Sequence, residues 1–257
     1  MTTARQVWLI ARRSVLRNAR QPGVWIPPLL FPLMLMAVNS NGLKAATHLP
    51  GFPTDSFLAF FLPFAFMQGA LFASAIAGTD LARDIDTGFL NRLALTPVRN
   101  SALLLGQIGG AFGIGLVQAI VYLSVGLIAG VHVDAGVAGV ALILVLALLI
   151  AIGFGTLGLW LALRTGSGEG VQSQFPLFFF LLFISSMNLP RNLIEVNWFR
   201  DLATINPVSY LIEALRSLII EGWNEEALAL GFGFALGLIA LSMVLAARQL
   251  RVRMART

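Results

Sequence analysis

The sequence predicts an all-α membrane protein with six transmembrane helices and both termini on the cytoplasmic side. Three observations support this fold class. Of the 257 residues, 58% are hydrophobic and only 11% are charged, whereas soluble domains carry about 25% charged residues. Six segments are apolar over roughly the 20 residues that a helix needs to cross the hydrocarbon core. The basic residues gather on one side of these segments.

The six predicted spans are continuously apolar and do not alternate between apolar and polar residues. Backbone groups in lipid are satisfied only in helices or closed barrels, and continuous apolar runs indicate helices. The expected spans are Val24–Gly42, Phe57–Thr79, Ala102–Ala129, Gly136–Leu163, Gln174–Leu189 and Ala227–Ala247. The fifth is the shortest. No large soluble segment separates them, so residues 1–257 form one membrane domain.

The distribution of charge predicts the orientation. Thirteen of the 17 lysines and arginines flank the spans on the side that carries both termini, and eight of the 12 acids lie on the other side. Because basic loops remain cytoplasmic, both termini are expected inside the cell. Anionic lipid headgroups are then the natural neighbours of these arginines, and nucleic acid is not expected as a partner.

The N-terminal segment, residues 1–22, is a moderately amphipathic helix candidate. Its apolar face comprises Val7, Trp8, Ala11, Val15 and Ala19, and its basic face comprises Arg12, Arg13, Arg17 and Arg20. Leu9 and Leu16 interrupt the basic face. Two interpretations stay open from the sequence: a helix lying in the cytoplasmic interface, or a basic tail that only sets orientation.

The cytoplasmic segment 80–99 is longer than a simple connection requires. Asp80 is expected to cap a short helix that contains Asp84, and Gly88 interrupts it. Beyond the interruption, Phe89, Leu90 and Leu93 form an apolar ridge at helical spacing, and Pro97 ends the element. An exposed apolar ridge favours docking onto another protein. The alternative is a helix lying on lipid, which the acids of this segment disfavour.

The outer segment 190–226 contains a second amphipathic helix candidate. Asn206 followed by Pro207 is a typical helix start, and Gly222 is a plausible end. Glu213 and Arg216 lie three residues apart and are expected to pair on the polar face. The helix is too short and too charged to span alone, so it is expected to be interfacial or re-entrant.

Several kinds of chemistry are excluded by the residues themselves. The chain has no cysteine and only two histidines, which leaves little material for a metal site. Lys44 is the only lysine and lies on the outer side, so the GxxxxGK[ST] phosphate-binding loop is absent. The spans carry no acid away from their ends, which disfavours proton-coupled transport. No cofactor is therefore expected on this chain.

Glycine and phenylalanine follow two patterns within the spans. The pairs Gly106/Gly110, Gly109/Gly113 and Gly233/Gly237 have the small-xxx-small spacing that lets helices approach closely. Spans two and five hold 11 of the 19 phenylalanines. Contact with lipid is the default interpretation of these rings, and a cavity for an amphiphilic substrate is the alternative. Polar span residues such as Gln68 are expected mainly to bond between helices.

Together these features resemble the permease subunit of type-2 ABC exporters, and within them the daunorubicin-resistance type, which exports drugs or lipids. The resemblance covers nearly the whole chain and rests on ARDIDTGFLNRLALTPVR in the first cytoplasmic loop and NPVSYLIEALR before the last span. It implies a dimer of permeases, formed with itself or with a related chain, above two ATPase subunits that bind ATP and Mg.

The resemblance also implies roles for individual residues. ATPase coupling would involve Asp80, Arg83, Asp84, Phe89, Leu90, Arg92 and Leu93. The substrate pathway would involve Phe60, Phe64, Gln68, Phe72, Phe179, Phe183 and Ser186. The outer gate helix would involve Asn206, Pro207, Tyr210, Glu213 and Arg216.

The resulting hypothesis is an export permease of the bacterial inner membrane, driven by a separate ATPase subunit. A permease for polysaccharide or lipid-linked glycan is an alternative, although only two tyrosines are present to stack sugars. A membrane assembly factor without transport activity is a further alternative of another class. Copurification with a nucleotide-binding chain would distinguish it from the permease.

Overall fold

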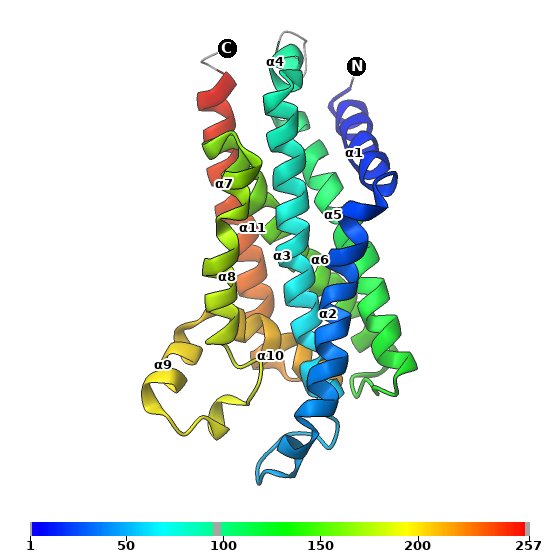
Figure 1. The fold of residues 1–257 in the computed structure, drawn as a ribbon, viewed down its shortest axis with the longest axis vertical. Coiled ribbons are helices and arrows are strands. Elements are labelled where there is room, and N and C mark those ends of the chain that lie inside the picture. Colours follow the sequence, from blue (N-terminus) through cyan, green and yellow to red (C-terminus); the bar gives the residue numbers. More distant parts are fainter. Residues whose placement is uncertain (1, 95–98, 255–257) are drawn as a thin grey trace.

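The computed structural model describes residues 2–94 and 99–254, and within them the regular structure is entirely helical. Figure 1 shows a bundle of long helices running roughly parallel to its long axis. The prediction that Pro97 ends a helix, and the cytoplasmic placement of Arg256, concern residues outside this part of the chain.

The N-terminal segment is a helix, α1 (Thr3–Ala19), and the first predicted span follows as α2 (Pro22–Gly42). The break falls at Arg20 and Gln21 because Pro22 has no N–H to donate into a continuing helix. Proline is well placed at the start of a new helix, where that N–H would have no partner. The α-helical interpretation of the N-terminus is therefore confirmed.

The central element is α3 (Phe57–Asp86), which packs against α2, α5 and α6 and is buried along almost its whole length. Its first turn is capped by Ser56, whose Oγ accepts a hydrogen bond from the Ala59 N–H at 3.2 Å. The helix continues beyond the predicted end of the span at Thr79. The expectation that Asp80 caps a new helix is wrong, because Asp80 and Asp84 belong to the last turns of α3.

After Gly88, whose φ is 65°, a short helix α4 (Phe89–Ala94) follows as predicted. Then come α5 (Asn100–Ile128) and α6 (Gly136–Thr165), joined by a turn. The N–H groups of Asp134 and Ala135 in this turn donate to carbonyls of α10, so the turn is fastened to the outer helix. Gly166 ends α6 in the left-handed region at φ 75°, the usual role of glycine there.

The fifth predicted span is not one continuous helix. Its residues form α8 (Gln174–Phe183), preceded by the single turn of α7 (Gly168–Gln172). Ten helical residues rise about 15 Å, roughly half of the hydrocarbon core. The prediction of one helix over Gln174–Leu189 is wrong because Ser185 bonds back to the Leu182 carbonyl and Pro190 follows shortly. Such residues compete with the helical backbone pattern.

Among the described residues, five helices are long and apolar enough to cross a membrane. They are α2, α3, α5 from Ser101, α6 and α11 (Glu225–Met254). The chain is therefore a multi-pass membrane protein. Figure 1 shows α7 and α8 following one another along the bundle beside these helices, where the sequence placed its fifth span.

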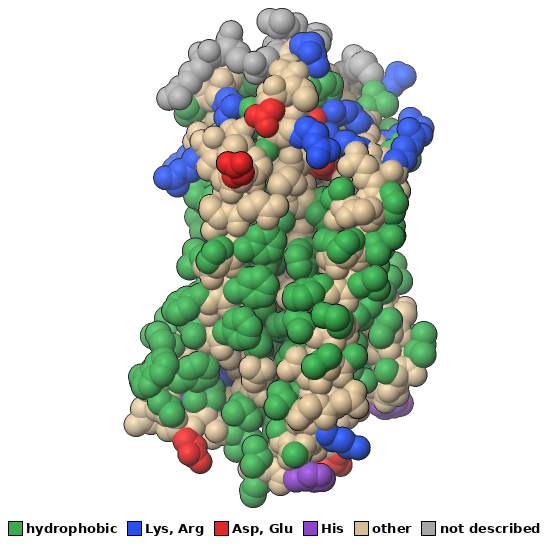
Figure 2. All heavy atoms as spheres, in the orientation of Figure 1, with side chains coloured by type: hydrophobic (Ala, Val, Ile, Leu, Met, Phe, Trp, Pro, Cys, Tyr) green, Lys and Arg blue, Asp and Glu red, His purple; other side chains and the backbone are tan. Residues whose placement is uncertain are grey.

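The two ends of the bundle differ in charge. Both termini and α4 lie at one end, and the short helices α9 (Asn197–Ile205) and α10 (Pro207–Ile220) lie at the other (Figure 1). Figure 2 shows arginine side chains gathered at the first end and hydrophobic side chains covering the middle. We call the first the arginine-rich end and the second, after the orientation that the sequence predicts, the outer end. An apolar belt between polar ends is the surface that a bilayer requires.

Candidate functional site

A buried ion-pair network joins α1 to α3 at the arginine-rich end. Asp84 accepts hydrogen bonds from both Nη atoms of Arg13 at 2.9 Å and from Nη1 of Arg17 at 3.0 Å. Gln107 of α5 donates to the same carboxylate at 3.2 Å. One turn earlier, Asp80 lies 3.0 Å from Nη2 of Arg17. Three helices therefore meet around two carboxylates.

These two acids, which the sequence places in the cytoplasmic segment 80–99, are buried in the protein. Asp80 is 5% exposed and Asp84 is 2% exposed. The hydrogen bonds that Arg13 donates to Asp84 raise the pKa of the Arg13 guanidinium above its ordinary value, so this arginine stays charged. A buried carboxylate is tolerated only when it is paired, and the pairing partners here are supplied by α1. The two acids therefore hold the N-terminal helix α1 against α3.

The spacing of these residues is a signal that the sequence analysis missed. Arg13 and Arg17 are four apart on α1, and Asp80 and Asp84 are four apart on α3. Residues four apart share a helix face, so two basic and two acidic residues at that spacing match each other along two packed helices. The sequence shows the basic pair and the acidic pair, but it does not show that the two pairs face each other.

The short helix α4 lies against this network. The guanidinium of Arg13 is stacked over the ring of Phe89, 3.9 Å from its centroid. Leu90 is only 1% exposed, so the expectation of a fully exposed ridge is wrong for this residue. Leu93 is partly buried against the same core, whereas Arg83 and Arg92 are exposed. The apolar side chains of α4 therefore pack mainly against the protein, and the neighbouring arginines are exposed at the surface.

The glycines of α5 form the groove that receives α1. A Cβ atom on Gly106 would lie 2.5 Å from Cβ of Ile10, and one on Gly109 would lie 2.5 Å from Cβ of Ala11. Close packing by the first two small-xxx-small pairs is therefore confirmed, with α1 as the partner. A Cβ atom on Gly233 or Gly237, the third pair, would meet no atom of the described residues within 4 Å, so that pair makes no such contact among them.

A row of phenylalanines crosses α2, α3 and α8. Phe72 lies between Phe31 and Phe175, with ring centroids 6.2 and 5.9 Å away. Along α8, Phe175, Phe179 and Phe183 follow at intervals of 6.2 Å. We call these five rings the aromatic row. Phe31 is 39% exposed and Phe183 is 56% exposed, so both ends of the row reach the surface.

Only part of the predicted pathway set belongs to this row. Phe72, Phe179 and Phe183 are in it, whereas Phe60, Phe64, Gln68 and Ser186 are buried inside the bundle, none more than 3% exposed. Both polar atoms of Gln68 lack a hydrogen-bond partner within the described part of the chain. Phe31 and Phe175 are row members that the sequence analysis missed, although the interval of four between Phe175, Phe179 and Phe183 signals a shared face.

At the outer end, Arg216 is turned into the protein. It is 4% exposed, and its guanidinium lies over the ring of Phe60, 3.6 Å from the centroid. Its Nε donates to the Phe60 carbonyl and its Nη2 to the Met187 carbonyl, both at 3.2 Å. The residue thereby joins α10 to the start of α3 and to the chain that follows α8.

The predicted Glu213–Arg216 pair does not form. Glu213 instead accepts hydrogen bonds from Nε and Nη2 of Arg191, and this pairing raises the pKa of the Arg191 guanidinium. The prediction is wrong because three residues of helix carry Arg216 to the buried face of α10, while Glu213 stays at its edge. A cavity of about 410 Å³ lies beside them, lined in part by Arg191, Glu213, Arg216 and Glu221.

The remaining predicted gate residues build α10 itself. Asn206 accepts from the Val208 N–H at 3.0 Å and donates to the Leu181 carbonyl of α8 at 2.5 Å. Pro207 occupies the first helical position, which confirms the predicted helix start. The Tyr210 hydroxyl donates to the Thr204 carbonyl at 2.8 Å, and its ring stacks on Phe234 at 4.9 Å. The helix is thus tied to α8, α9 and α11.

The long apolar helices and the arginine-rich end together define a multi-pass membrane protein, and the aromatic row reaches its surface. The comparison with protein families gives the particular family. The ABC-2 type transporter profile matches residues 5–220, so the chain belongs to that family. It is therefore the permease component of an ABC transporter.

Two curated relatives carry drug-resistance names. The probable doxorubicin resistance ABC transporter permease protein DrrC of Mycobacterium tuberculosis is 26% identical over 200 residues, which is 78% of this chain and 70% of that protein. The daunorubicin resistance ABC transporter permease protein DrrB1 of Streptomyces coeruleorubidus is 26% identical over 205 residues, covering 75% and 65% of the two chains. The chain is similar to permeases of drug-resistance exporters.

Proposed function

We propose that this chain is the membrane-spanning half of an ATP-driven exporter that moves a hydrophobic or amphiphilic substrate, a drug or a lipid, out of a bacterial cell. The names of its relatives support a drug. The observation that carries the substrate chemistry is the aromatic row, because a row of adjacent rings that reaches the surface at both ends suits apolar and planar molecules.

ATP and Mg are bound in this proposal by a separate ATPase subunit, present in two copies, which docks on the arginine-rich end. The exposed side chains of Arg83 and Arg92 and the partly exposed ring of Phe89 supply the docking surface around α4. Asp80, Asp84 and Leu90 act behind it as internal supports, because they are buried. The arginine-rich end is then cytoplasmic, which follows the positive-inside rule.

Movement of α4 reaches the transmembrane helices through charged contacts. Phe89 presses on Arg13, and Arg13 is bonded to Asp84 near the end of α3. A displaced α4 therefore moves α1 and α3 together. ATP drives the cycle only if it binds the two states of the permease with different affinity, so this rigid link is what converts ATPase closure into a change of packing.

The transport path in this proposal lies between two permease copies that face each other across their aromatic rows. The partner is a second copy or a related chain. The permease lies in the inner membrane. The predicted fifth span is a broken crossing made by α7 and α8, which brings the number of crossings to six, and α10 closes the outer end. Arg216 holds this gate by its bonds to the Phe60 and Met187 carbonyls.

Efflux from cells that produce the permease with its ATPase tests this function. Intracellular doxorubicin fluorescence is expected to fall when both chains are present and ATP is available. Phe179→Ala removes the middle ring of α8 and should abolish most of this efflux. Phe180→Ala is the matched control, because Phe180 is 58% exposed on the same helix but outside the row.

Two outcomes would contradict the proposal. Efflux that survives without any ATPase subunit would exclude ATP-driven export by this mechanism. Equal losses for Phe179→Ala and Phe180→Ala would exclude a specific role for the row. A chain that copurifies with glycan-synthesis proteins and moves no amphiphile would instead favour the glycan or assembly alternatives.

A further inference from the structure

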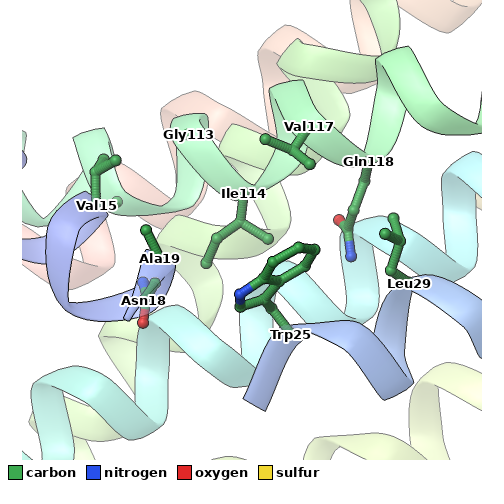
Figure 3. A pocket seen from close by; sticks show the side chains of 10 residues that line it. Val15, Asn18, Ala19, Trp25, Leu29, Gly113, Ile114, Val117 and Gln118 are labelled. Carbon is green, nitrogen blue, oxygen red and sulfur yellow. The ribbon is translucent and has the colours of Figure 1, made fainter. Parts of the chain in front are cut away.

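A cavity of about 130 Å³ lies where α1, α2 and α5 meet, away from the aromatic row and from α4. Figure 3 shows its lining: Val15, Asn18 and Ala19 come from α1, Trp25 and Leu29 from α2, and Gly113, Ile114, Val117 and Gln118 from α5. The cavity exists because α1 breaks from α2 at Arg20 and Gln21, and because Gly110 and Gly113 bring no side chains into the space.

Three polar atoms in this lining lack a hydrogen-bond partner within the described residues. They are Nδ2 of Asn18, Nε1 of Trp25 and Oε1 of Gln118, all shielded from solvent. Gln118 is 5% exposed and extends from α5 toward α2 in Figure 3. A buried polar group without a partner costs about 1–3 kcal/mol. The remaining lining is mostly aliphatic, so an occupant with a polar group and an apolar body fits both features.

The position of the cavity indicates the source of the occupant. It lies at the arginine-rich end of the apolar belt, beside the junction of α1 and α2. Arg20 directly follows the lining residue Ala19 and is exposed. In a phospholipid, ester carbonyls lie between the charged phosphate and the acyl chains. This order of groups matches the order of Arg20, Trp25 and the aliphatic lining.

We propose that this cavity binds an anionic phospholipid of the surrounding leaflet. The phosphate contacts Arg20, an ester carbonyl accepts from Trp25 Nε1, and one acyl segment enters between Ile114 and Val117. Nδ2 of Asn18, the second orphan donor of the lining, donates to another ester oxygen, since ester oxygens only accept hydrogen bonds. An apolar space of roughly 150 Å³ holds a benzene-sized group, so only part of one chain enters.

Water alone is a poor occupant of this space. One water would bond the three orphan polar atoms, but its volume of about 30 Å³ would leave most of this mainly aliphatic space of about 130 Å³ without an occupant. An anionic lipid gains in addition about 1 kcal/mol for each arginine near its headgroup. The proposal concerns lipid held at a peripheral site, so it does not depend on what the protein exports.

Tryptophan fluorescence tests the site directly, because Trp25 is part of its wall. A variant that retains only Trp25, with Trp8, Trp160, Trp198 and Trp223 replaced by phenylalanine, is reconstituted in phosphatidylcholine vesicles. A sparse amount of phosphatidylglycerol with brominated acyl chains is added, and brominated phosphatidylcholine serves as the comparison lipid. Stronger quenching by the phosphatidylglycerol is expected. Arg20→Gln should weaken its apparent affinity about fivefold.

A matched pair of variants separates the cavity from the general lipid surface. Val117→Phe fills the cavity and should abolish the preference for phosphatidylglycerol. Ile120→Phe, on the same helix and 47% exposed but outside the lining, should leave it intact. Equal quenching by both brominated lipids, or a preference that survives Val117→Phe, would overturn the proposal in favour of water or another occupant.

Native mass spectrometry of the full chain gives a readout independent of the tryptophan replacements. The purified protein is expected to retain phosphatidylglycerol through detergent exchange, and Val117→Phe should lose it while Ile120→Phe keeps it. Loss of the lipid from the unmodified chain at the same rate as phosphatidylcholine would contradict the site, whatever the fluorescence of the variant shows.

Discussion

Arg13 of α1 and Asp84 of α3 are 71 residues apart in sequence, yet their side chains form a two-bond ion pair with both distances at 2.9 Å. Because two parallel N–H···O bonds fix the guanidinium in one plane, this pair sets the position of α1 as well as neutralising a buried charge. The same guanidinium covers the Phe89 ring, so a single side chain of α1 contacts both α3 and α4.

Asp84→Asn is expected to destabilise the protein because it leaves Arg17 and Arg13 facing a neutral amide at a buried site. Breaking one side of a buried pair costs about 3–5 kcal/mol, and partial exposure of Arg13 places this case at the lower end. The thermal unfolding midpoint in detergent measures the loss. Asp86→Asn is the control, since Asp86 is exposed. A double variant with Arg13→Gln should be less destabilised than the sum, and strict additivity would show that the pair does not act as a unit.

Phe89→Asp is expected to uncouple transport from ATP hydrolysis while the permease still inserts. The substitution places an acid beside Arg13, where it competes with Asp84 and removes the packed ring between α4 and α1. Transport by the complex should fall strongly, and copurification of the ATPase should fall with it. Thr87→Asp introduces the same charge at an exposed site and should change neither. Normal transport by the Phe89 variant would refute the role assigned to α4.

Gly109→Leu is expected to displace α1, because the new side chain would occupy the space held by Ala11. Overpacking of this kind typically costs about 1–3 kcal/mol. Gly233→Leu makes the same chemical change on α11, where no described atom lies within 4 Å, and it should leave the unfolding midpoint of the monomer unchanged. Similar midpoints for the two variants would mean that α1 does not rest in the α5 groove.

Arg216→Leu is expected to loosen the outer end, because the carbonyls of Phe60 and Met187 lose their donors. Each buried acceptor left without a partner costs about 1–3 kcal/mol. Protease cleavage in the outer segment 190–205 of the variant should accelerate, and a passive leak of amphiphile should appear without ATP. Arg200→Leu, at an exposed position in α9, provides the comparison and should show neither effect.

The location of the spans could be read from the sequence because hydropathy is a local property. Runs without charge predict burial in lipid whatever their neighbours are, and five of the six predicted spans fold as continuous helices. The fifth was misjudged because apolar residues continue to Leu189 while the backbone bonds of Ser185 already end the helix. Hydropathy does not reveal the end of a helix when the polar residues that end it are few and lie within an apolar run.

The candidate site could be predicted only in part, because its residues meet through contacts between distant segments. The sequence indicated that Asp80, Asp84 and Phe89 matter, and it placed α4 after Gly88. It did not show that the acids face Arg13 and Arg17. Two charged residues four apart on a helix can equally well lie on a face that is exposed to solvent. The pairing of Glu213 was predicted locally with Arg216 and is made instead with Arg191, 22 residues away.

The sequence by itself determined that this protein is a membrane protein, that five of its helices are continuous apolar runs, and that its positive charge lies at the end with both termini. Each of these follows from the free-energy cost of placing a charged group or an unpaired backbone polar group in hydrocarbon. This cost depends on each segment's own residues and not on its neighbours. Only the tertiary structure decided which carboxylates are buried, which rings form the aromatic row and where α1 rests. Those outcomes depend on which helix faces are brought together, and burial turns an ordinary surface charge into one that must find a partner.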